Sequence, residues 1–316
     1  MTIWVCGEVL VDLIPDQSQN GSSGTNESTE RIGVIGGGTE NTAIALARLG
    51  HKTEFIDGIS TDKWGVLAKK ELEADGVGTR FCKFSDKPTC QAIVTLNKDG
   101  GASYEFIIDG TATFDFSRDW LPDPYKHKPV ALHIGTLVTV VEPAASVLFD
   151  WAMEVAELAP VIFDPNIRPA VIGDREKYRE HVEKWISISS VVKVSDDDLS
   201  WLYPGEDHVA IANRWITDGV AVVVITKGAD GLVGVTSYGV VSVPGFKVEV
   251  TDTIGAGDTV GAVITEAVKN IGLDELHGAA LIVTLEKAAR AAAFTCTRKG
   301  AQPPTARELN ELNAVH

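Results

Sequence analysis

Short apolar runs, separated by segments of helix length, dominate the hydrophobic pattern of the chain. Five of them read IWVCG at 3–7, VALHI at 130–134, VIFD at 161–164, VVKV at 191–194 and AVVVIT at 221–226. Apolar runs this continuous are typical of strands covered on both faces, and strands that alternate with helices form parallel sheets. The pattern therefore predicts an α/β fold with a mostly parallel central sheet flanked by helices.

Two segments depart from this rhythm. In residues 9–35, two apolar runs flank a stretch rich in Ser, Gly, Asn and Thr, and in residues 88–108, two strand patterns flank the turn signal Lys98-Asp99-Gly100-Gly101. Paired strand patterns around such turns are typical of hairpins. We expect a small antiparallel β lid over a substrate cleft; the alternative is an extension of one edge of the main sheet.

The length and composition set the domain organisation. With 316 residues, 44% of them hydrophobic, the chain can bury a large core. We expect one α/β domain over 1–316, in which 9–35 and 86–116 form the inserted lid and 17–29 form a mobile loop. Because a projecting sheet leaves open strand edges that usually need covering, we also expect a homodimer through the lid.

The charge narrows the class of partner. The chain has 44 acidic and 28 basic residues, a net charge of −16, and an isoelectric point near 4.8. Nucleic acids and anionic membranes attract Lys and Arg clusters, so this composition disfavours both and favours a small molecule. An acidic protein binds an anion such as ATP through local backbone N–H groups and a divalent metal, which predicts a Gly-rich site.

The N-terminal run carries no basic segment, and no apolar run reaches the length of a membrane span. The four cysteines, at 6, 82, 90 and 296, are scattered and form no CxxC pair. We therefore expect a cytoplasmic protein with reduced thiols.

A Gly-rich turn at 251–259 is the strongest chemical signal. It reads Thr251-Asp252-Thr253-Ile254-Gly255-Ala256-Gly257-Asp258-Thr259 and leads into an apolar stripe of helical spacing. Two glycines let the backbone approach a ligand, and the first N–H groups of a helix form an anion site. From the residues alone, Asp258 is either a catalytic base or a helix cap. The stripe consists of Val260, Val263, Ile264, Ala267 and Val268.

Other nucleotide-binding patterns are missing from the sequence. The chain contains no GxxxxGK[ST], and its first strand leads into Gly7-Glu8-Val9-Leu10-Val11-Asp12 rather than GxGxxG. A P-loop kinase and a Rossmann dehydrogenase are therefore disfavoured.

The turn at 251–259 resembles the second signature of the ribokinase-like (PfkB) carbohydrate kinases. The segment Gly36-Gly37-Gly38-Thr39-Glu40-Asn41-Thr42-Ala43 resembles the family's first signature, and the resemblance extends from residue 3 to about 305 in the family's order. It implies the ribokinase-like fold and ATP-dependent phosphorylation of a sugar, with Mg²⁺. In this family the Asp that closes the turn is the base, which implies Asp258, with Gly255, Ala256 and Gly257 stabilising the phosphoryl charge.

The same resemblance implies a sugar site. Gly37 and Gly38 match the glycines that approach the sugar, Asn41 matches the residue that binds its hydroxyls, and Asp12 matches the carboxylate that holds two of them. Arg168 follows a strand and could bind a phosphate or sugar oxygen. The residues leave other roles open: a helix cap for Asn41, a solvated strand end for Asp12 and a structural ion pair for Arg168.

Thr226, Gly228 and Gly231 follow the last apolar strand and resemble the family's nucleotide turn, T-x-G-x-x-G, with Gly257 as a further nucleotide contact. Taken alone, the pattern is an ordinary Gly-rich turn.

Two acidic residues are implied as metal or cation ligands. Many relatives carry Asn-x-x-Glu where this chain has Ser195-Asp196-Asp197-Asp198, so Asp198 would order the Mg²⁺ shell through a bound water, or merely favour a helix N-terminus. Asp252 matches a position that helps to hold a monovalent cation in some relatives, which leaves a K⁺ requirement open.

The segments around 133–136, 163–169 and 192–195 resemble fructokinases and 2-keto-3-deoxygluconate kinases more than ribokinases or adenosine kinases. Fructose, phosphorylated on a primary hydroxyl, is thus the expected substrate and 2-keto-3-deoxygluconate the runner-up. A sugar-phosphate kinase would need more basic residues near the lid. A non-catalytic sugar or nucleotide sensor of the same fold is the alternative from another class.

Overall fold

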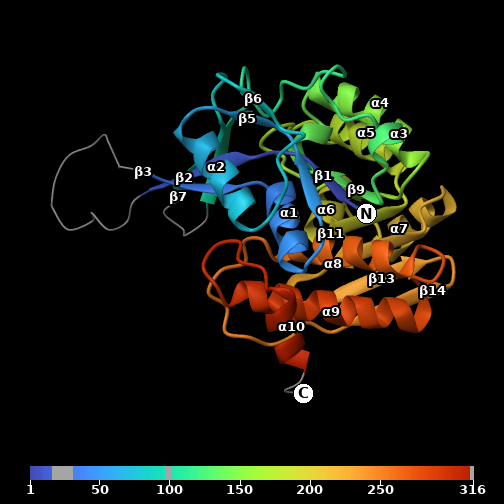
Figure 1. The fold of residues 1–316 in the computed structure, drawn as a ribbon. Helices are drawn as coiled ribbons and strands as arrows, with labels where there is room; N and C mark the ends of the chain where they lie inside the picture. The colour runs from blue at the N-terminus through green and yellow to red at the C-terminus, as the bar shows by residue number, and fades with distance from the viewer. Residues whose placement is uncertain (16–30, 97–101, 314–316) are drawn as a thin grey trace.

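The computed structural model describes residues 1–15, 31–96 and 102–313. Its core is an eight-stranded sheet of order β14-β13-β12-β11-β10-β9-β1-β4 (Figure 1). All five predicted core strands are present, which confirms the predicted fold class. The strands are β1 Ile3–Cys6, β4 Thr53–Ile56, β9 Ala131–Gly135, β10 Val161–Asp164, β11 Val191–Ser195, β12 Val222–Thr226, β13 Leu232–Thr236 and β14 Gly239–Val243.

Six neighbouring strands, from β12 to β4, pair in parallel, and the β13–β14 hairpin extends one edge antiparallel. The carboxyl ends of β1, β9, β10, β11 and β12 therefore meet along one edge of the sheet. Ligands of open α/β sheets bind at this edge, because the loops that leave it converge there.

Helices cover both faces of the sheet, as Figure 1 shows with α4 and α5 on one side and α8 and α9 on the other. The buried apolar side chains form two hydrophobic cores. One core contains the aromatic side chains of Trp151, Trp185 and Trp215. The other contains Leu46, Ile264 and Leu285. The helices are α1 Gly38–Arg48, α2 Lys63–Ala74, α3 Pro124–His127, α4 Ala144–Ala156, α5 Arg175–Ile186, α6 Asp196–Leu202, α7 His208–Thr217, α8 Ala256–Ile271, α9 Gly278–Cys296 and α10 Ala306–Asn313, with 3₁₀ turns at Thr136–Thr139 and Gly228–Asp230.

Helix α8 begins where the Gly-rich turn predicts. The five positions of its apolar stripe are all at most 6% exposed, so this face is buried against the sheet and the neighbouring helices. In the described part of the chain no helix is both long and apolar enough to cross a membrane. All four cysteines are free.

The lid is a separate four-stranded sheet that projects from the core at the left of Figure 1, rather than an extension of the main sheet. Its two hairpins are antiparallel as expected, but they join through a parallel pair, β2 with β7, which the hairpin pattern did not predict. The chain leaves the sheet after β8, so 108–116 contains no lid strand. The lid strands, in the order β3-β2-β7-β8, are β2 Leu10–Pro15, β3 Arg31–Gly36, β7 Cys90–Leu96 and β8 Ala102–Ile107.

The expected mobile loop at 17–29 and the turn signal at 98–101 lie outside the described residues. A short parallel pair, β5 Gly58–Ser60 with β6 Lys83–Ser85, lies between β4 and β7 in the chain.

Candidate active site

A cavity of about 590 Å³ lies between the carboxyl edge of the main sheet and the lid. The two Gly-rich signatures, far apart in the sequence, both line it. Eight of the predicted site residues are in its wall: Asp12, Gly37, Gly38, Asn41, Arg168, Gly255, Gly257 and Asp258. Ala256, Thr226, Gly228, Gly231, Asp198 and Asp252 are not.

Asp258 is the third residue of α8, whose N-cap is Gly255, so Asp258 does not occupy the cap position. Its carboxylate Oδ2 instead accepts a hydrogen bond of 2.8 Å from Nδ2 of Asn41. Helix α1 likewise begins after Gly37 without a side-chain cap. The capping interpretation is therefore wrong for both residues, because their side chains bond to each other inside the cavity.

Burial sets the chemistry of Asp258. The side chain is 8% exposed, and its pKa is raised to about 6, chiefly by loss of solvation. The positive charge of Lys193, the bond from Asn41 and the charge of Arg168 lower the pKa, whereas Asp164 raises it. At neutral pH the carboxylate is mainly ionised, and its raised basicity suits a general base.

Both glycines of the Gly-rich turn, Gly255 and Gly257, lie where a side chain would crowd a neighbouring group. Gly255 has φ 77°, and a Cβ there would lie 2.6 Å from the Cβ of Ala301, so the turn and the 301 segment are in direct contact. A Cβ on Gly257 would lie 3.1 Å from Nζ of Lys193. Ala256 donates its N–H to the Thr253 carbonyl at 3.3 Å, within the turn itself.

Gly38, at the start of α1, is where several side chains converge. A Cβ there would lie 2.8 Å from Nδ2 of Asn166, 2.9 Å from Cγ2 of Thr136 and 3.2 Å from Oδ1 of Asp258. Only a glycine lets α1 begin this close to the three groups. The glycine at position 38 thus lets the start of α1 lie against the loops after β9 and β10 and against the first turn of α8.

The lid contributes Asp12 from β2. It is half-buried, and burial raises its pKa to about 6 while the charge of Arg168 lowers it. A Cβ on Gly36, in the neighbouring strand, would lie 3.2 Å from Oδ2 of Asp12. The carboxylate is therefore enclosed by the cavity wall and is not a solvated strand end.

Arg168 lies in the loop after β10, and its Nη1 donates to the carbonyls of Asn166 and Ile167 at 3.2 and 3.0 Å. Among the described residues, no carboxylate lies within ion-pair distance of its guanidinium. Since Arg168 is exposed and lines the cavity, its charge is available to a ligand, and the structural ion pair is not observed.

Sequence reasoning missed five polar residues of the cavity wall, which are Glu8, Thr136, Asn166, Lys193 and Thr253. Glu8 is 2% exposed, accepts a hydrogen bond from the Thr136 hydroxyl, and has a pKa raised to about 7, mainly by burial. Glu8 and Lys193 had a readable signal, because each is a single charge in or just after an apolar strand. Asn166 follows β10 and Thr136 follows β9, and both have positive φ. The residue pattern gave no signal that either side chain would line the cavity.

The two predicted cation ligands, Asp198 and Asp252, accept hydrogen bonds from backbone N–H groups. Asp198 forms a capping box with Ser195 and accepts from the Ile167 N–H at 2.9 Å and the Ser195 N–H at 3.2 Å. Asp252 accepts from the N–H groups of Ile254 and Gly300 at 3.0 and 2.9 Å. The described residues contain no cluster of three or more His, Cys, Asp or Glu that could hold a metal. The side chains of Asp198 and Asp252 thus order the loops around the cavity.

The predicted nucleotide turn follows β12. Gly228 and Gly231 have φ of 52° and 98°, and Lys227 N–H bonds to the Gly231 carbonyl at 2.9 Å. A Cβ on Gly231 would lie 2.1 Å from the Val243 carbonyl oxygen, so a side chain there would displace the end of β14. The turn is built as the glycines predict, on the same edge of the sheet as the cavity.

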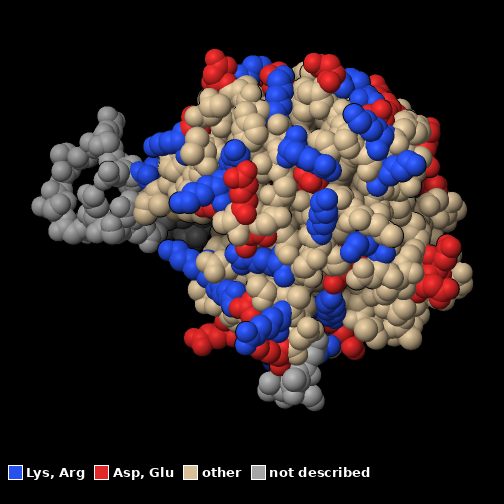
Figure 2. Space-filling model, viewed as in Figure 1, with Lys and Arg blue, Asp and Glu red and all other residues tan. Residues whose placement is uncertain are grey.

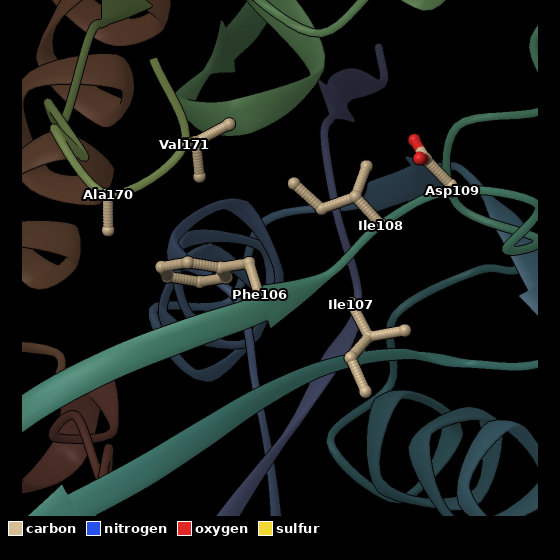
Figure 3. Close-up of a pocket in the computed structure, with 6 residues that line it drawn as sticks. All are labelled: Phe106, Ile107, Ile108, Asp109, Ala170 and Val171. Atoms are coloured by element: carbon tan, nitrogen blue, oxygen red, sulfur yellow. The ribbon is translucent and has the colours of Figure 1, made fainter. Parts of the chain in front are cut away.

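A second, smaller cavity of about 350 Å³ borders the first. It is lined by Phe106, Ile107, Ile108 and Asp109 at the end of β8 and by Ala170 and Val171 in the loop after Arg168 (Figure 3). Phe106 lines both cavities. In Figure 3 its ring lies toward Ala170, whereas the Ile107 side chain points away from it. The Phe106 ring thus forms part of the wall between the two.

Comparison with known proteins agrees with this architecture. The pfkB family carbohydrate kinase model matches residues 2–308. A fructokinase from Rhizobium leguminosarum bv. trifolii is 36% identical over 267 residues, which cover 84% of this chain and 79% of that protein. Fructokinase-2 from Zea mays is 30% identical over 98% of this chain and 92% of its own length.

Solved structures share the fold. The fructokinase from Xylella fastidiosa with bound ATP superposes with a TM-score of 0.86 at 24% identity, covering 99% of this chain and 98% of that one. A double mutant of the fructokinase from Vibrio cholerae O395, in a form with fructose, ADP and potassium ion, gives a TM-score of 0.80 at 25% identity over 99% of this chain and 97% of that one.

The chain belongs to the pfkB family of carbohydrate kinases. This confirms the resemblance inferred from the two signatures. It also confirms the predicted class of enzyme, an ATP-dependent sugar kinase, which is a phosphotransferase with an alcohol group as acceptor.

Proposed function

We propose that this chain is an ATP-dependent fructokinase in which Asp258 is the general base. The observation that carries the assignment is the buried, ionisable carboxylate of Asp258, held at the start of α8 in the wall of the cavity. The relatives at 36% and 30% identity named above, both fructokinases, support fructose as the acceptor.

The reaction needs one proton transfer and one in-line displacement. Asp258 takes the proton of a primary hydroxyl, that oxygen forms a bond to the γ-phosphorus of ATP, and the bond to the β–γ bridging oxygen breaks, releasing ADP. The N–H groups of Gly255 and Gly257 are proposed to stabilise the charge that develops on the phosphoryl group. Ala256, whose N–H donates to the Thr253 carbonyl, is proposed to hold the turn in shape. Closure of the lid would exclude water from the transfer.

The sugar is proposed to lie between the lid and the start of α1. Asp12 accepts hydrogen bonds from two sugar hydroxyls, and Asn41 binds another while it holds Asp258. Gly37 and Gly38 leave the space for the sugar ring. Arg168 binds a sugar oxygen with its exposed guanidinium.

The nucleotide is proposed to extend from Gly257 toward Thr226, Gly228 and Gly231 on the same sheet edge. Mg²⁺ enters with the ATP phosphates, since this ion usually keeps several waters and takes few protein ligands. The carboxylate of Asp198 retains a free lone pair on each oxygen, which fits a hydrogen bond from a metal-bound water and not a direct bond. Asp252, which joins the turn to Gly300, is the proposed organiser of a K⁺ site.

Arg168 also favours a second candidate acceptor. A guanidinium without a carboxylate partner suits a substrate that brings its own carboxylate, and 2-keto-3-deoxygluconate is such a sugar acid. The paired Asn41 and Asp258 argue against the sensor, because binding alone gives no reason to bury an ionisable base.

A homodimer through the lid and a cytoplasmic location complete the proposal. The lid edges expose Ile32 by 52%, Val34 by 43% and Ile107 by 42%, and open apolar edges favour pairing. Light scattering at micromolar concentration is expected to give twice the chain mass, and a monomer would contradict the dimer. Four free cysteines suit a reducing compartment.

A coupled ADP-release assay over a panel of sugars tests the function. We expect the highest kcat/KM for fructose, followed by 2-keto-3-deoxygluconate. A tenfold preference for ribose or a nucleoside would overturn the assigned sugar while leaving the kinase class intact. No ADP release with any acceptor, from a folded preparation that binds sugar, would favour the sensor.

A further inference from the structure

Lys193 is a charged residue in an interior strand of the parallel sheet. It lies in β11 and is only 4% exposed, between Val192 and Val194, which are both fully buried. An isolated ammonium group is costly to bury. A lysine at this position therefore requires a partner of opposite charge and, since it interrupts an apolar strand, a reason to be there.

Its partner is Asp164 at the end of the neighbouring strand β10. Nζ of Lys193 donates to Oδ2 of Asp164 at 2.8 Å. Burial lowers the pKa of Lys193, but the charges of Asp164 and Asp258 outweigh this effect and the pKa is raised overall. The side chain is consequently an ammonium ion at any physiological pH. The other oxygen of the pair, Oδ1 of Asp164, is buried without a hydrogen-bond partner in the described residues.

The ammonium group reaches the active site from below the Gly-rich turn. Lys193 lines the cavity together with Gly257 and Asp258. A Cβ on Gly257 would lie 3.1 Å from Nζ, so the glycine leaves just enough room for the ammonium against the first turn of α8. Lys193 thus lies where this turn would place the transferred phosphoryl group.

The charge balance calls for a cation at this point. Asp258 and Glu8 are buried acids of the cavity wall, and Asp164 is a third buried acid, bonded to Lys193. ATP adds further negative charge. On the face drawn in Figure 2, Lys and Arg side chains lie on the surface among Asp and Glu side chains, whereas Lys193 is buried. Arg168 lines the same cavity, but it is exposed and lies in the loop after β10. Its charge lowers the pKa of Asp12, in the lid.

We infer that Lys193 is a catalytic residue that contacts the transferred phosphoryl group, and that Asp164 is the positioning residue that holds it there. The inference rests on the proposed phosphoryl transfer at Asp258. One of the three N–H donors of the ammonium is used by Asp164 in the described structure, which leaves two for phosphoryl oxygens. In this role Lys193 binds the phosphoryl group from a core strand. In P-loop enzymes, whose sequence pattern this chain lacks, the lysine of the P-loop binds the phosphates.

The competing explanation is that Lys193 and Asp164 form a purely structural ion pair between β10 and β11. Two variants distinguish this explanation from a catalytic role of Lys193. Lys193→Gln keeps a donor for Asp164 and removes the charge. Lys193→Met combined with Asp164→Asn removes both charges, so no unpaired ion is left in the core. Lys269→Met, at the far end of α8 where Nζ bonds to His51, is the matched control.

We expect the double variant to melt near the wild type and Lys193→Gln to melt lower, because Gln leaves the Asp164 carboxylate without a counter-ion. Both should bind fructose within about threefold of wild type and lose kcat by roughly 10² to 10³-fold. Calorimetry should show ATP affinity falling at least tenfold, with ADP affinity changed by less than threefold, because Lys193 faces the terminal phosphate. Lys269→Met should match the wild type. A folded variant with kcat within fivefold of wild type, or equal losses for ATP and ADP, would overturn the inference.

The wild-type enzyme provides a test that does not depend on folded variants. With ¹³C-labelled lysine, the signal of the buried Lys193 should shift on binding a non-hydrolysable ATP analogue and stay in place with ADP. An unmoved signal would contradict the contact. If the wild type prefers another sugar, the fructose assignment fails, but the difference between ATP and ADP still tests Lys193.

Discussion

Asn41 and Asp258, 217 positions apart in the sequence, are joined by a hydrogen bond of 2.8 Å from Nδ2 to Oδ2. The next residue of α1, Thr42, directs its hydroxyl toward the backbone carbonyl of Asp258 at 3.3 Å. The two Gly-rich signatures therefore form one site, in which the start of α1 orients the base at the start of α8.

Asn41→Ala tests this connection. Because the bond from Asn41 lowers the pKa of Asp258, its loss should raise that pKa and move the acidic limb of the kcat/KM profile to higher pH. A bond to a charged group is worth about 1.5–3 kcal/mol, which corresponds to a pKa rise of about 1 to 2 pH units. The ionised fraction of Asp258 at pH 7, and with it kcat/KM, should fall by roughly 2- to 15-fold. An unchanged limb, measured from pH 5 to 8, would show that Asn41 does not act on the base.

Gly255→Ala should disable the turn without unfolding the protein. The residue has φ 77°, and its new Cβ would meet Ala301 at 2.6 Å, so both strain and collision displace the N–H groups. We expect kcat to fall at least tenfold. Gly272→Ala is the control, because it has φ 87° at the other end of α8 but nothing within 4 Å. Similar kinetic losses in both variants would mean that only backbone strain matters.

Stability should fall as the pH rises from 4.5 to about 8, between the unfolded and folded pKa values of the buried carboxyl of Glu40. Glu40 is 1% exposed, its Oε1 has no partner in the described residues, and burial raises its pKa to about 8 from 4.5. A carboxyl with a raised pKa in the folded state contributes stability below its unfolded pKa, and this contribution is lost as the pH passes about 8. Glu8, with a pKa of about 7, acts in the same direction. The melting temperature should therefore be higher at pH 6 than at pH 8.5.

Glu40→Gln should reduce this difference, raising the melting temperature by a few degrees at pH 8.5 and leaving it near wild type at pH 5. Glu180→Gln, an exposed site on α5, is the control and should change neither. A wild-type melting temperature that does not vary between pH 6 and 8.5 would refute the assignment to buried carboxyls.

Much of this architecture was predictable, and the failures have physical causes. The runs at 161–164 and 191–194 predicted strands because both faces of the sheet are covered. The parallel pairing of β2 with β7 was not predictable, since hairpin turns determine only pairings between consecutive strands. Lys193 was visible as one charge within VVKVS, but its role depends on Asp164 and Gly257, which only the fold brings near it.

Phe106→Ala should broaden the acceptor range. Removing the ring opens the wall between cavities of about 590 and 350 Å³, so longer acceptors such as disaccharides gain room while fructose loses an apolar contact. We expect the KM for fructose to rise about tenfold and the ratio of kcat/KM for longer acceptors to that for fructose to increase. Ile107→Ala, which is directed away from Phe106 and lines only the smaller cavity, should leave the KM for fructose unchanged; equal effects of the two substitutions on this KM would exclude Phe106 as a selective wall.

Asp258→Asn addresses the central claim. The substitution is isosteric, leaves the turn intact and removes only the carboxylate that accepts the hydroxyl proton. Because Asp258 is not the N-cap of α8 and its burial already disfavours the charge, stability should be near wild type. Sugar affinity should also persist, since the proposed sugar contacts of Asp12 and Asn41 remain.

The direct measurement is the initial rate of fructose phosphorylation by Asp258→Asn, with melting temperature and sugar affinity taken on the same preparation. Asp218→Asn, an exposed carboxyl after α7, is the control and should be fully active. The account predicts a folded, sugar-binding variant whose kcat is roughly 10² to 10⁴-fold lower than wild type. A folded, sugar-binding variant that retains more than about a tenth of wild-type kcat would contradict it.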